Sequence, residues 1–294
     1  MAGDGGPADP AGDSGRGEGP QPGLAQLGEP VVAVAGELPG WAALVRAPNP
    51  GPMTLDGTNT WVLRAAGGGP AVVVDPGPAD EQHLRAVAAA AGPVAGVLLT
   101  HGHPDHVDGL DRFRELTGAP LLTATSTPLL AATGEPLAGL AITALPAPGH
   151  TADSVCLLVD GAGQRAVLTG DTILGRGTTV VAWPDGNLGD YLASLERLAE
   201  RGAGVPALPG HGPALADCGA AAGYYLAHRQ ARLVQVAAAV AAGAGTPAEV
   251  VAVVYAGIDP ALRPAAEWSV QAHLAYLDEQ ARESSTGSQP LDEP

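Results

Sequence analysis

The order of apolar and polar residues along the chain predicts short strands that alternate with amphipathic helices. Compact apolar runs bounded by glycine and proline are typical of buried strands, whereas apolar residues spaced three or four positions apart are typical of helices that cover a sheet. Strands are expected at residues 31–34, 42–46, 60–64, 71–75, 94–100, 121–124, 141–145, 154–159 and 165–169. Interleaved with helices, these strands predict an α+β fold with two sheets packed face to face and helices outside.

Three helices are expected between the strands. Asp80 is expected to cap a helix that ends at Gly92, and His83 within it is expected to be solvated. A second helix is predicted over 108–117, and Asp190 is expected to cap the third. The three helices supply the outer layers of the predicted fold.

The pattern becomes helical from about residue 217. Helices are predicted over 224–242, 247–256 and 264–281, and their apolar faces exceed what so short a segment can bury alone. Part of that surface is therefore expected to pack on the preceding domain or on a second copy of the chain in a homodimer. The predicted organisation is a disordered Gly/Pro/Asp-rich tail at 1–28, a catalytic domain at 29–216, a helical domain at 217–282 and a disordered tail at 283–294.

The strongest chemical signal is the run His-Gly-His-Pro-Asp-His at 101–106, directly after the apolar strand predicted at 94–100. Three imidazoles and a carboxylate at the end of a buried strand are costly unless a cation lies among them. Zinc is the expected cation, because it prefers histidine and carboxylate ligands. An extended backbone lets the first two histidines share one ion while the aspartate and the last histidine reach another.

Three further ligands are expected at turn-like places, because His150, Asp171 and His211 each lie beside a glycine that lets the backbone bend sharply. The seven candidates divide into two sites with one shared residue: His101, His103 and His150 in the first, Asp105, His106 and His211 in the second, and Asp171 as the bridge. Two zinc ions per chain are therefore predicted.

The string H-x-H-x-D-H followed by His, Asp and His resembles the dinuclear pattern of the metallo-β-lactamase superfamily. The segments 49–60 and 175–179 further resemble the β-lactamase-like protein 2 branch of that superfamily. The resemblance implies a four-layer αββα sandwich with the ligands on loops along one edge, followed by a small winged-helix-like domain. It extends over roughly residues 30 to 282.

The expected mechanism follows from the two ions. A hydroxide that bridges them is available as nucleophile near neutral pH, because zinc lowers the pKa of bound water to about 7. Asp105 and Asp171 are the candidate catalytic residues, since both lie close enough to orient the bridging water. No serine or cysteine nucleophile is required, and Cys156 and Cys218 are expected to be reduced structural thiols.

Other residues near the motifs are candidates for supporting roles. Asn59, with Thr58 and Trp61, is expected on the substrate side, and Arg176 is a candidate for binding an anionic group of the substrate. Asp75 either braces a metal-bound histidine or caps a turn. His228 and His273 are expected to be structural.

Composition limits the function classes. The 294 residues carry a formal net charge of -17, with neither the basic start and apolar run of a signal peptide nor an apolar stretch long enough for a membrane span. A cytoplasmic location is therefore expected. Because residues 217–282 hold four arginines against six acidic residues, no general affinity for RNA is expected.

These observations favour a dinuclear zinc hydrolase that acts on an ester or thioester, with a small-molecule or acyl-carrier substrate. A single-strand-specific endoribonuclease with the same metal centre is the main alternative that the resemblance implies. A non-catalytic metal-binding module is a second alternative, although a complete ligand set argues against it. A diiron oxidoreductase is disfavoured, because no histidine ligand is replaced by an acidic residue and no flavodoxin-like domain is attached.

Overall fold

Two four-stranded sheets form the centre of the molecule in the computed structural model, which describes residues 33–123, 129 and 134–286. The predictions for residues 1–28 and 287–294 lie outside the described residues. The first sheet contains β1 (Ala42–Arg46), β2 (Asn59–Leu63), β3 (Ala71–Val74) and β4 (Val94–Leu98). The second contains β5 (Ala141–Pro146), β6 (Val155–Gly161), β7 (Gln164–Gly170) and β8 (Ala207–Pro209).

Both sheets have the same pairing pattern. In each, the strands follow one another in chain order, the first two pairs are antiparallel and the last pair is parallel. Parallel neighbours end at the same edge of a sheet. The segments that follow β3 and β4, and those that follow β7 and β8, therefore leave their sheets at a common edge, where the candidate ligands lie.

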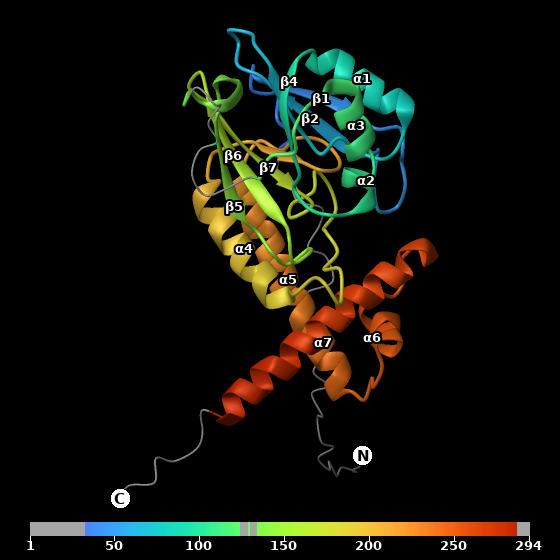
Figure 1. The fold of residues 1–294 in the computed structure, drawn as a ribbon. Helices are drawn as coiled ribbons and strands as arrows, with labels where there is room; N and C mark the ends of the chain where they lie inside the picture. Colours follow the sequence, from blue (N-terminus) through green and yellow to red (C-terminus); the bar gives the residue numbers. More distant parts are fainter. Residues whose placement is uncertain (1–32, 124–128, 130–133, 287–294) are drawn as a thin grey trace, which may run out of the picture.

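Alternation of side chains along the strands produces the layers. In β2, Trp61 and Leu63 pack into the cluster between the sheets, whereas Val62 packs against the helices on the outer face. The helices on that face are α1 (Glu81–Ala91) and α3 (Leu110–Thr117), and α2 (Pro104–Val107) precedes α3 (Figure 1). On the other sheet, α4 (Leu188–Arg201) and α5 (Cys218–Ala241) form the fourth layer. The predicted αββα sandwich is confirmed.

The helix caps agree with the sequence in one case and not in another. Asp80 caps α1 as predicted, and its Oδ1 accepts a hydrogen bond of 2.7 Å from the backbone N–H of His83. Asp190 does not cap α4, because the helix begins earlier. Asn187 is the cap, and its side-chain oxygen accepts from the backbone N–H of Asp190 at 3.0 Å.

Other boundaries also differ. The segment predicted as a strand at 121–124 forms, in its described part, only an isolated bridge from Leu121 to Val97, and Val34 forms one to Leu215. The short strand β8 was not predicted. Helix α5 begins six residues before the predicted 224, and α7 (Arg263–Thr286) continues into the segment expected to be a tail.

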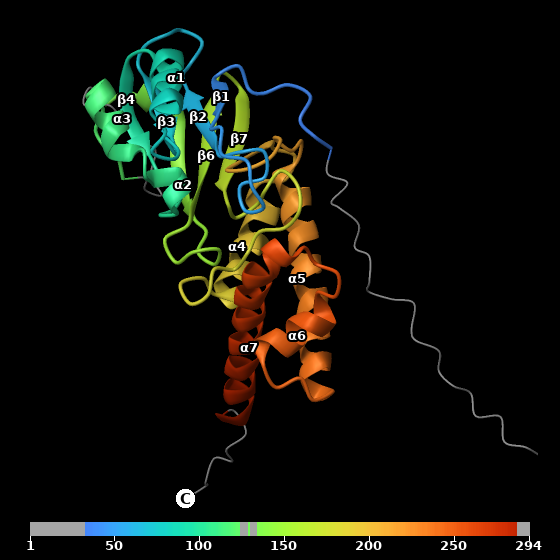
Figure 2. The ribbon, with the colours of Figure 1, turned by 90° about the vertical axis from the view of Figure 1, so that its right-hand side faces the viewer.

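The C-terminal helices extend from the sandwich as a second unit (Figure 2). Helix α6 (Pro247–Val254) and α7 pack on the second half of α5, around Val236, Val250 and Val270. The first half of α5 belongs to another cluster, in which Tyr225 packs with residues of α4 and β7. The expectation that part of the helical surface packs on the catalytic domain is confirmed, and α5 contributes to both cores.

Two further expectations concern the cysteines and membrane-spanning helices. Cys156 and Cys218 are buried and free, in agreement with their interpretation as reduced thiols. Within the described ranges, no helix combines the length and the hydropathy that crossing a bilayer would require.

Candidate metal centre

Seven side chains meet where the strands end at the common edge. The run 101–106 follows β4 and enters α2, and His150 lies between β5 and β6. Asp171 directly follows β7, and His211 lies two residues beyond the end of β8. An isolated bridge between Thr58 and His211 holds the start of β2 beside this edge. The ligand atoms form two groups: His101, His103, His150 and Asp171 in one, and Asp105, His106 and His211 in the other.

The first group is compact. His101 Nε2 and His150 Nε2 lie 3.0 and 3.1 Å from His103 Nδ1, so three ring nitrogens face one point. Asp171 Oδ2 is 3.9 Å from the ring nitrogen of His101 and 3.7 Å from that of His150. This arrangement of three imidazoles and one carboxylate matches the donor set of a zinc site.

The second group adjoins the first through Asp171. His106 Nε2 and His211 Nε2 are 3.3 Å apart, and Asp105 Oδ2 lies 3.4 Å from the former and 3.3 Å from the latter. Asp171 Oδ2 is also 3.3 Å from His211 Nε2, and its Oδ1 is 3.5 Å from His106 Nε2. Asp171 therefore lies within 4 Å of histidines of both groups.

Asp75 orients histidines of both groups. It follows β3, is 1% exposed, and its Oδ2 accepts from His106 Nδ1 at 2.9 Å. The hydroxyl of Thr100 donates to the same Oδ2 at 2.6 Å, so its oxygen accepts from His101 Nδ1, which is 3.0 Å away. Of the two roles that we considered for Asp75, the structure supports bracing of histidines.

Backbone carbonyls orient two more imidazoles. His150 Nδ1 lies 2.6 Å from the carbonyl oxygen of Val180, and His211 Nδ1 lies 3.3 Å from that of Gly57. Because a carbonyl oxygen only accepts, these rings carry their hydrogen on Nδ1 and direct the lone pair of Nε2 inward. His103 differs, since its Nδ1 faces the centre. The inward lone pairs are the form that binds a metal.

The surroundings of Asp171 also fit bound cations. Its Oδ1 is buried and has no hydrogen-bond partner among the described residues, a costly state for a carboxylate oxygen. A Cβ at Gly210 would lie 2.4 Å from this oxygen and 2.8 Å from His106 Cε1, so only glycine lets the β8 loop approach. The residues present therefore fit metal ions held by both groups.

The electrostatics of the cluster favour an ionised carboxylate and differ between the imidazoles. Burial opposes ionisation of Asp171, but His106 and His211 outweigh it and hold the pKa of this carboxyl well below its usual range. Burial, reinforced by His106, lowers the pKa of His101 to about 2, and burial also lowers the pKa of His150. Burial acts in the same direction on His106 and His211, but Asp171 outweighs it and raises the pKa of both rings. A divalent cation would replace the ring protons that Asp171 favours on His106 and His211, because it supplies the positive charge that this buried carboxylate requires.

Two residues expected on the substrate side lie elsewhere. Asn59 is fully buried, and its amide donates to the carbonyls of Pro209 and Gly212 at 3.0 and 2.9 Å, so it fastens the loop that carries His211. Trp61 lies in the core between the sheets and donates to Pro209. Both face away from solvent because β2 is buried on both sides.

Thr58 and Arg176 lie closer to the expected region. The hydroxyl of Thr58 donates to Asp105 Oδ2 at 2.7 Å, so Thr58 positions a candidate ligand. Arg176 lines a cavity beside the centre and forms a two-pronged ion pair with Asp56, at 2.5 and 3.0 Å. Its guanidinium is thus paired with Asp56, while the residue borders the cavity.

His83 was expected to be solvated and is buried. It is 3% exposed, and its Nε2 lies 3.0 Å from the hydroxyl of Thr60, which supplies a partner inside the fold. His273 is likewise buried, with Nδ1 against the carbonyl of Ser269, in agreement with a structural role. His228 lines the cavity described above, a position that no pattern in the sequence indicated.

Family models match two separate parts of the chain. Residues 53–128, which include the run 101–106, match the model described as "Metallo-beta-lactamase superfamily". Residues 246–288 match the model described as "Beta-lactamase associated winged helix domain", and they contain all of α6 and α7.

Curated relatives are similar over a shared stretch. A lactamase-like protein of Aspergillus niger is 31% identical over 204 residues, covering 65% of this chain and 61% of the relative. A protein of Aspergillus fumigatus named "Atrochrysone carboxyl ACP thioesterase" is 32% identical over 177 residues, covering 56% and 53%. A "Beta-lactamase-like protein 2 homolog" of Caenorhabditis elegans is 30% identical over 202 residues, covering 63% and 65%. The matches thus span 53 to 65% of the length of these relatives.

Solved structures share the fold over most of the chain. A metallo-beta-lactamase family protein of Thermus thermophilus superposes with a TM-score of 0.66 at 25% identity, covering 82% of this chain and 94% of that one. A beta-lactamase domain protein of Burkholderia ambifaria gives a TM-score of 0.66 at 22% identity, covering 83% and 88%. The chain therefore carries a metallo-β-lactamase superfamily domain, followed by a β-lactamase-associated winged helix domain.

Proposed function

We propose that the protein is a dinuclear zinc-dependent hydrolase that acts on an ester or thioester. The observation that carries the proposal is Asp171, which lies within 4 Å of ring nitrogens from both histidine groups. Its Oδ1 is buried without a hydrogen-bond partner among the described residues. A carboxylate in this position can bridge two ions. His101, His103 and His150 would hold one zinc, and Asp105, His106 and His211 the other.

When bound, divalent ions supply Lewis acidity that ionises water near neutral pH and polarises the carbonyl under attack. The side chains of this chain perform the remaining tasks. Asp105 and Asp171 accept hydrogen bonds from the attacking water and so orient it. Thr58 fixes Asp105, while Asp75 holds the imidazoles of both groups in position. The water oxygen bonds to the acyl carbon as the acyl–sulfur or acyl–oxygen bond breaks. The products are a carboxylate and a thiol or alcohol, which takes up a proton from the attacking water.

An acyl substrate is favoured over RNA by the cavity beside the centre. The cavity has a volume of about 300 Å³, is bordered by His150 and Asp171, and has walls that include Leu174 and Leu262. Such an apolar enclosure suits a hydrocarbon chain. Binding of RNA rests largely on neutralisation of phosphates by basic residues, and this chain has 14 basic against 31 acidic residues. The relative named as an acyl-carrier-protein thioesterase supports the same choice.

The proposal is tested by assaying the zinc-loaded protein against thioesters, oxyesters, lactones, phosphodiesters and single-stranded RNA. We expect turnover of a neutral acyl thioester or ester and none of RNA across a salt series. Cleavage of RNA without turnover of any acyl compound would contradict the proposal and favour the endoribonuclease. We further propose that the substrate is a small molecule or is attached to an acyl carrier, and that the protein is cytoplasmic.

A further inference from the structure

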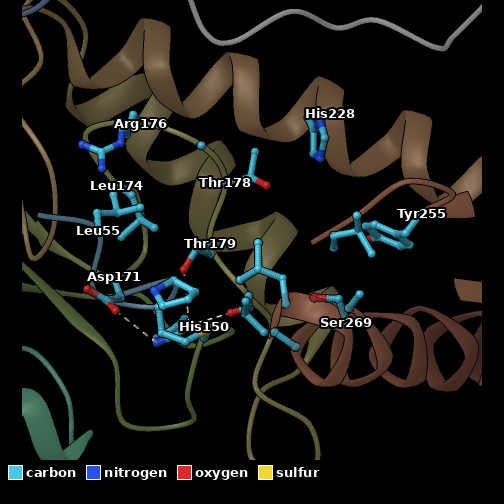
Figure 3. Close-up of a pocket in the computed structure, with 18 of the residues that line it drawn as sticks. Leu55, His150, Asp171, Leu174, Arg176, Thr178, Thr179, His228, Tyr255 and Ser269 are labelled. Atoms are coloured by element: carbon cyan, nitrogen blue, oxygen red, sulfur yellow. Dashed lines mark hydrogen bonds and ion pairs between the residues drawn. The ribbon is translucent and has the colours of Figure 1, made fainter. Parts of the chain in front are cut away.

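The cavity beside the metal centre continues to the C-terminal domain, where its chemistry changes (Figure 3). Asp171 and Tyr255 lie at opposite sides of the cavity, and Leu174 belongs to its apolar wall. At the far side it is lined by His228 and by two arginines one and four positions further along α5. The cavity thus joins the candidate metal centre to a cationic end.

The cationic end is unusual for this chain. Three of its 14 basic residues line this one cavity, although the formal net charge is -17. Arg229 and Arg232 lie at this end. Arg176 instead lies on the side of Asp171 and is paired with Asp56 (Figure 3). Asp171, at the metal end, is the sole carboxylate among the described lining residues. Fixed charges of one sign in a partly enclosed space attract ligands of the opposite sign.

Arg229 is the more deeply buried of the two arginines on α5. It is 2% exposed, its Nη2 donates to the carbonyl of Thr179, and its Nε is buried without a partner among the described residues. A buried guanidinium without a carboxylate is costly, because its charge is removed from water and not compensated.

Arg232 also has only neutral partners among the described residues. Its Nη1 donates to Gln235 Oε1 and to the carbonyl of Val254, both at 2.9 Å, and its guanidinium lies 4.5 Å from the ring centre of Tyr255. Throughout the described part of the chain, the arginine–carboxylate ion pairs involve other arginines. Both guanidinium groups therefore keep an uncompensated charge beside the cavity.

We propose that Arg229 and Arg232 form a binding site for an oxyanion, a carboxylate or a phosphate, at the end of the substrate remote from the scissile bond. This inference rests on the proposed hydrolase function and names its substrate class. The substrate would be an ester or thioester with an apolar middle and an anionic end. Charge-assisted hydrogen bonds from arginine to such an end supply both affinity and orientation.

Binding of unreactive probes to the zinc-loaded full chain tests the site by isothermal titration calorimetry. The probes are octanoate, octyl phosphate and the neutral octanamide, so the first two arms distinguish a carboxylate from a phosphate. We expect at least one anionic probe to bind roughly tenfold or more tightly than octanamide. Arg232→Gln should remove most of this preference. Arg165→Gln alters an exposed arginine paired with Asp160, at the end of β7 remote from Asp171, and should retain it.

Two results would overturn the inference. One is equal affinity for octanamide and both anions in the unsubstituted protein. The other is an unchanged preference in Arg232→Gln, which would mean that the anion binds the metals instead. If Arg232→Gln does not fold, Arg232→Lys provides the comparison, since it retains the charge but loses the two-pronged geometry and should show a reduced preference. Hydrolysis of a neutral hexanoyl thioester by the unsubstituted protein tests the proposed function separately.

Discussion

Asp75 links the two ligand groups through hydrogen bonds at a single carboxylate oxygen. That oxygen accepts from His106 directly and from Thr100, whose own oxygen accepts from His101. A neutral amide at this position accepts more weakly and introduces an N–H that has no acceptor. A hydrogen-bond acceptor at the ring nitrogen that does not bind the metal fixes the orientation of the imidazole and raises its basicity as a ligand.

We therefore expect Asp75→Asn to weaken zinc binding about 10- to 100-fold. Competition with a chromogenic chelator measures this directly and needs no substrate. Asp111→Asn, an exposed carboxylate on α3, is the control and should bind zinc normally. Unchanged zinc affinity in Asp75→Asn would show that Asp75 has no role in orienting the ligands.

Asp171→Ala is expected to lower turnover by several orders of magnitude, because a carboxylate within 4 Å of histidines of both groups is lost. The fold should survive, since the side chain lies beyond β7 and packs in none of the apolar clusters. Turnover of the best substrate and circular dichroism measure the two effects. Asp160→Ala, on the exposed face of β6, is the matched control. Near-normal turnover of the Asp171 variant would refute the bridging role.

At the residue level, the sequence predicted which candidate metal ligands lie together. It did not predict which of the neighbouring side chains are buried and which reach solvent. The ligand set could be proposed because each member beyond the run 101–106 lies beside a glycine at a turn, where the backbone can bend. Asn59 and Trp61 were misplaced, because a strand buried on both faces gives no alternation to show which side chains reach solvent. The prediction for His83 on α1 was wrong because its buried partner, Thr60, lies on β2 and is distant in sequence.

At the level of elements, local signals predicted most helices and strands, while boundaries depended on tertiary context. Asn187 and Asp190 are both good caps three residues apart, and the sequence alone does not separate them. The three-residue β8 forms because it pairs in parallel with β7, an interaction distant in sequence. Helix α5 starts early because alanines near its beginning, such as Ala221, pack on the sandwich.

The packing of α7 on α5 predicts a pH dependence of stability. Burial, reinforced by Arg229, lowers the pKa of His273 to about 4, and Arg232 and His228 of α5 act in the same direction. In the unfolded chain His273 has the ordinary histidine pKa of about 6.5. The unfolded state therefore binds the proton more tightly than the folded state, and protonation of His273 favours unfolding. The stabilisation from neutral His273 is complete above pH 6.5 and is lost as the pH falls toward 4.

Replacing His273 by glutamine removes this titration. Between pH 7 and 5, the unsubstituted protein should lose about 2 kcal/mol more free energy of unfolding than His273→Gln. Urea unfolding followed by circular dichroism at both pH values gives the difference. If the free energy of unfolding changed equally with pH in the two proteins, the pKa of His273 would not be lowered by folding.

For the whole molecule, the two-unit organisation followed from the change to helical periodicity near residue 217. The boundary between the two units could not be predicted from the sequence, because α5 contributes its first half to the sandwich and its second half to the C-terminal unit. This shared helix also places the C-terminal unit beside the metal centre, so that both units line one cavity. A homodimer remains a prediction that measurement of the mass in solution would test.

The central claim is that the seven side chains hold two zinc ions with Asp171 between them. Elemental analysis of the purified chain after reconstitution with zinc and removal of loosely bound metal tests it most directly. We expect close to two zinc ions per chain. A content of one ion or fewer would contradict the dinuclear centre and the function proposed from it.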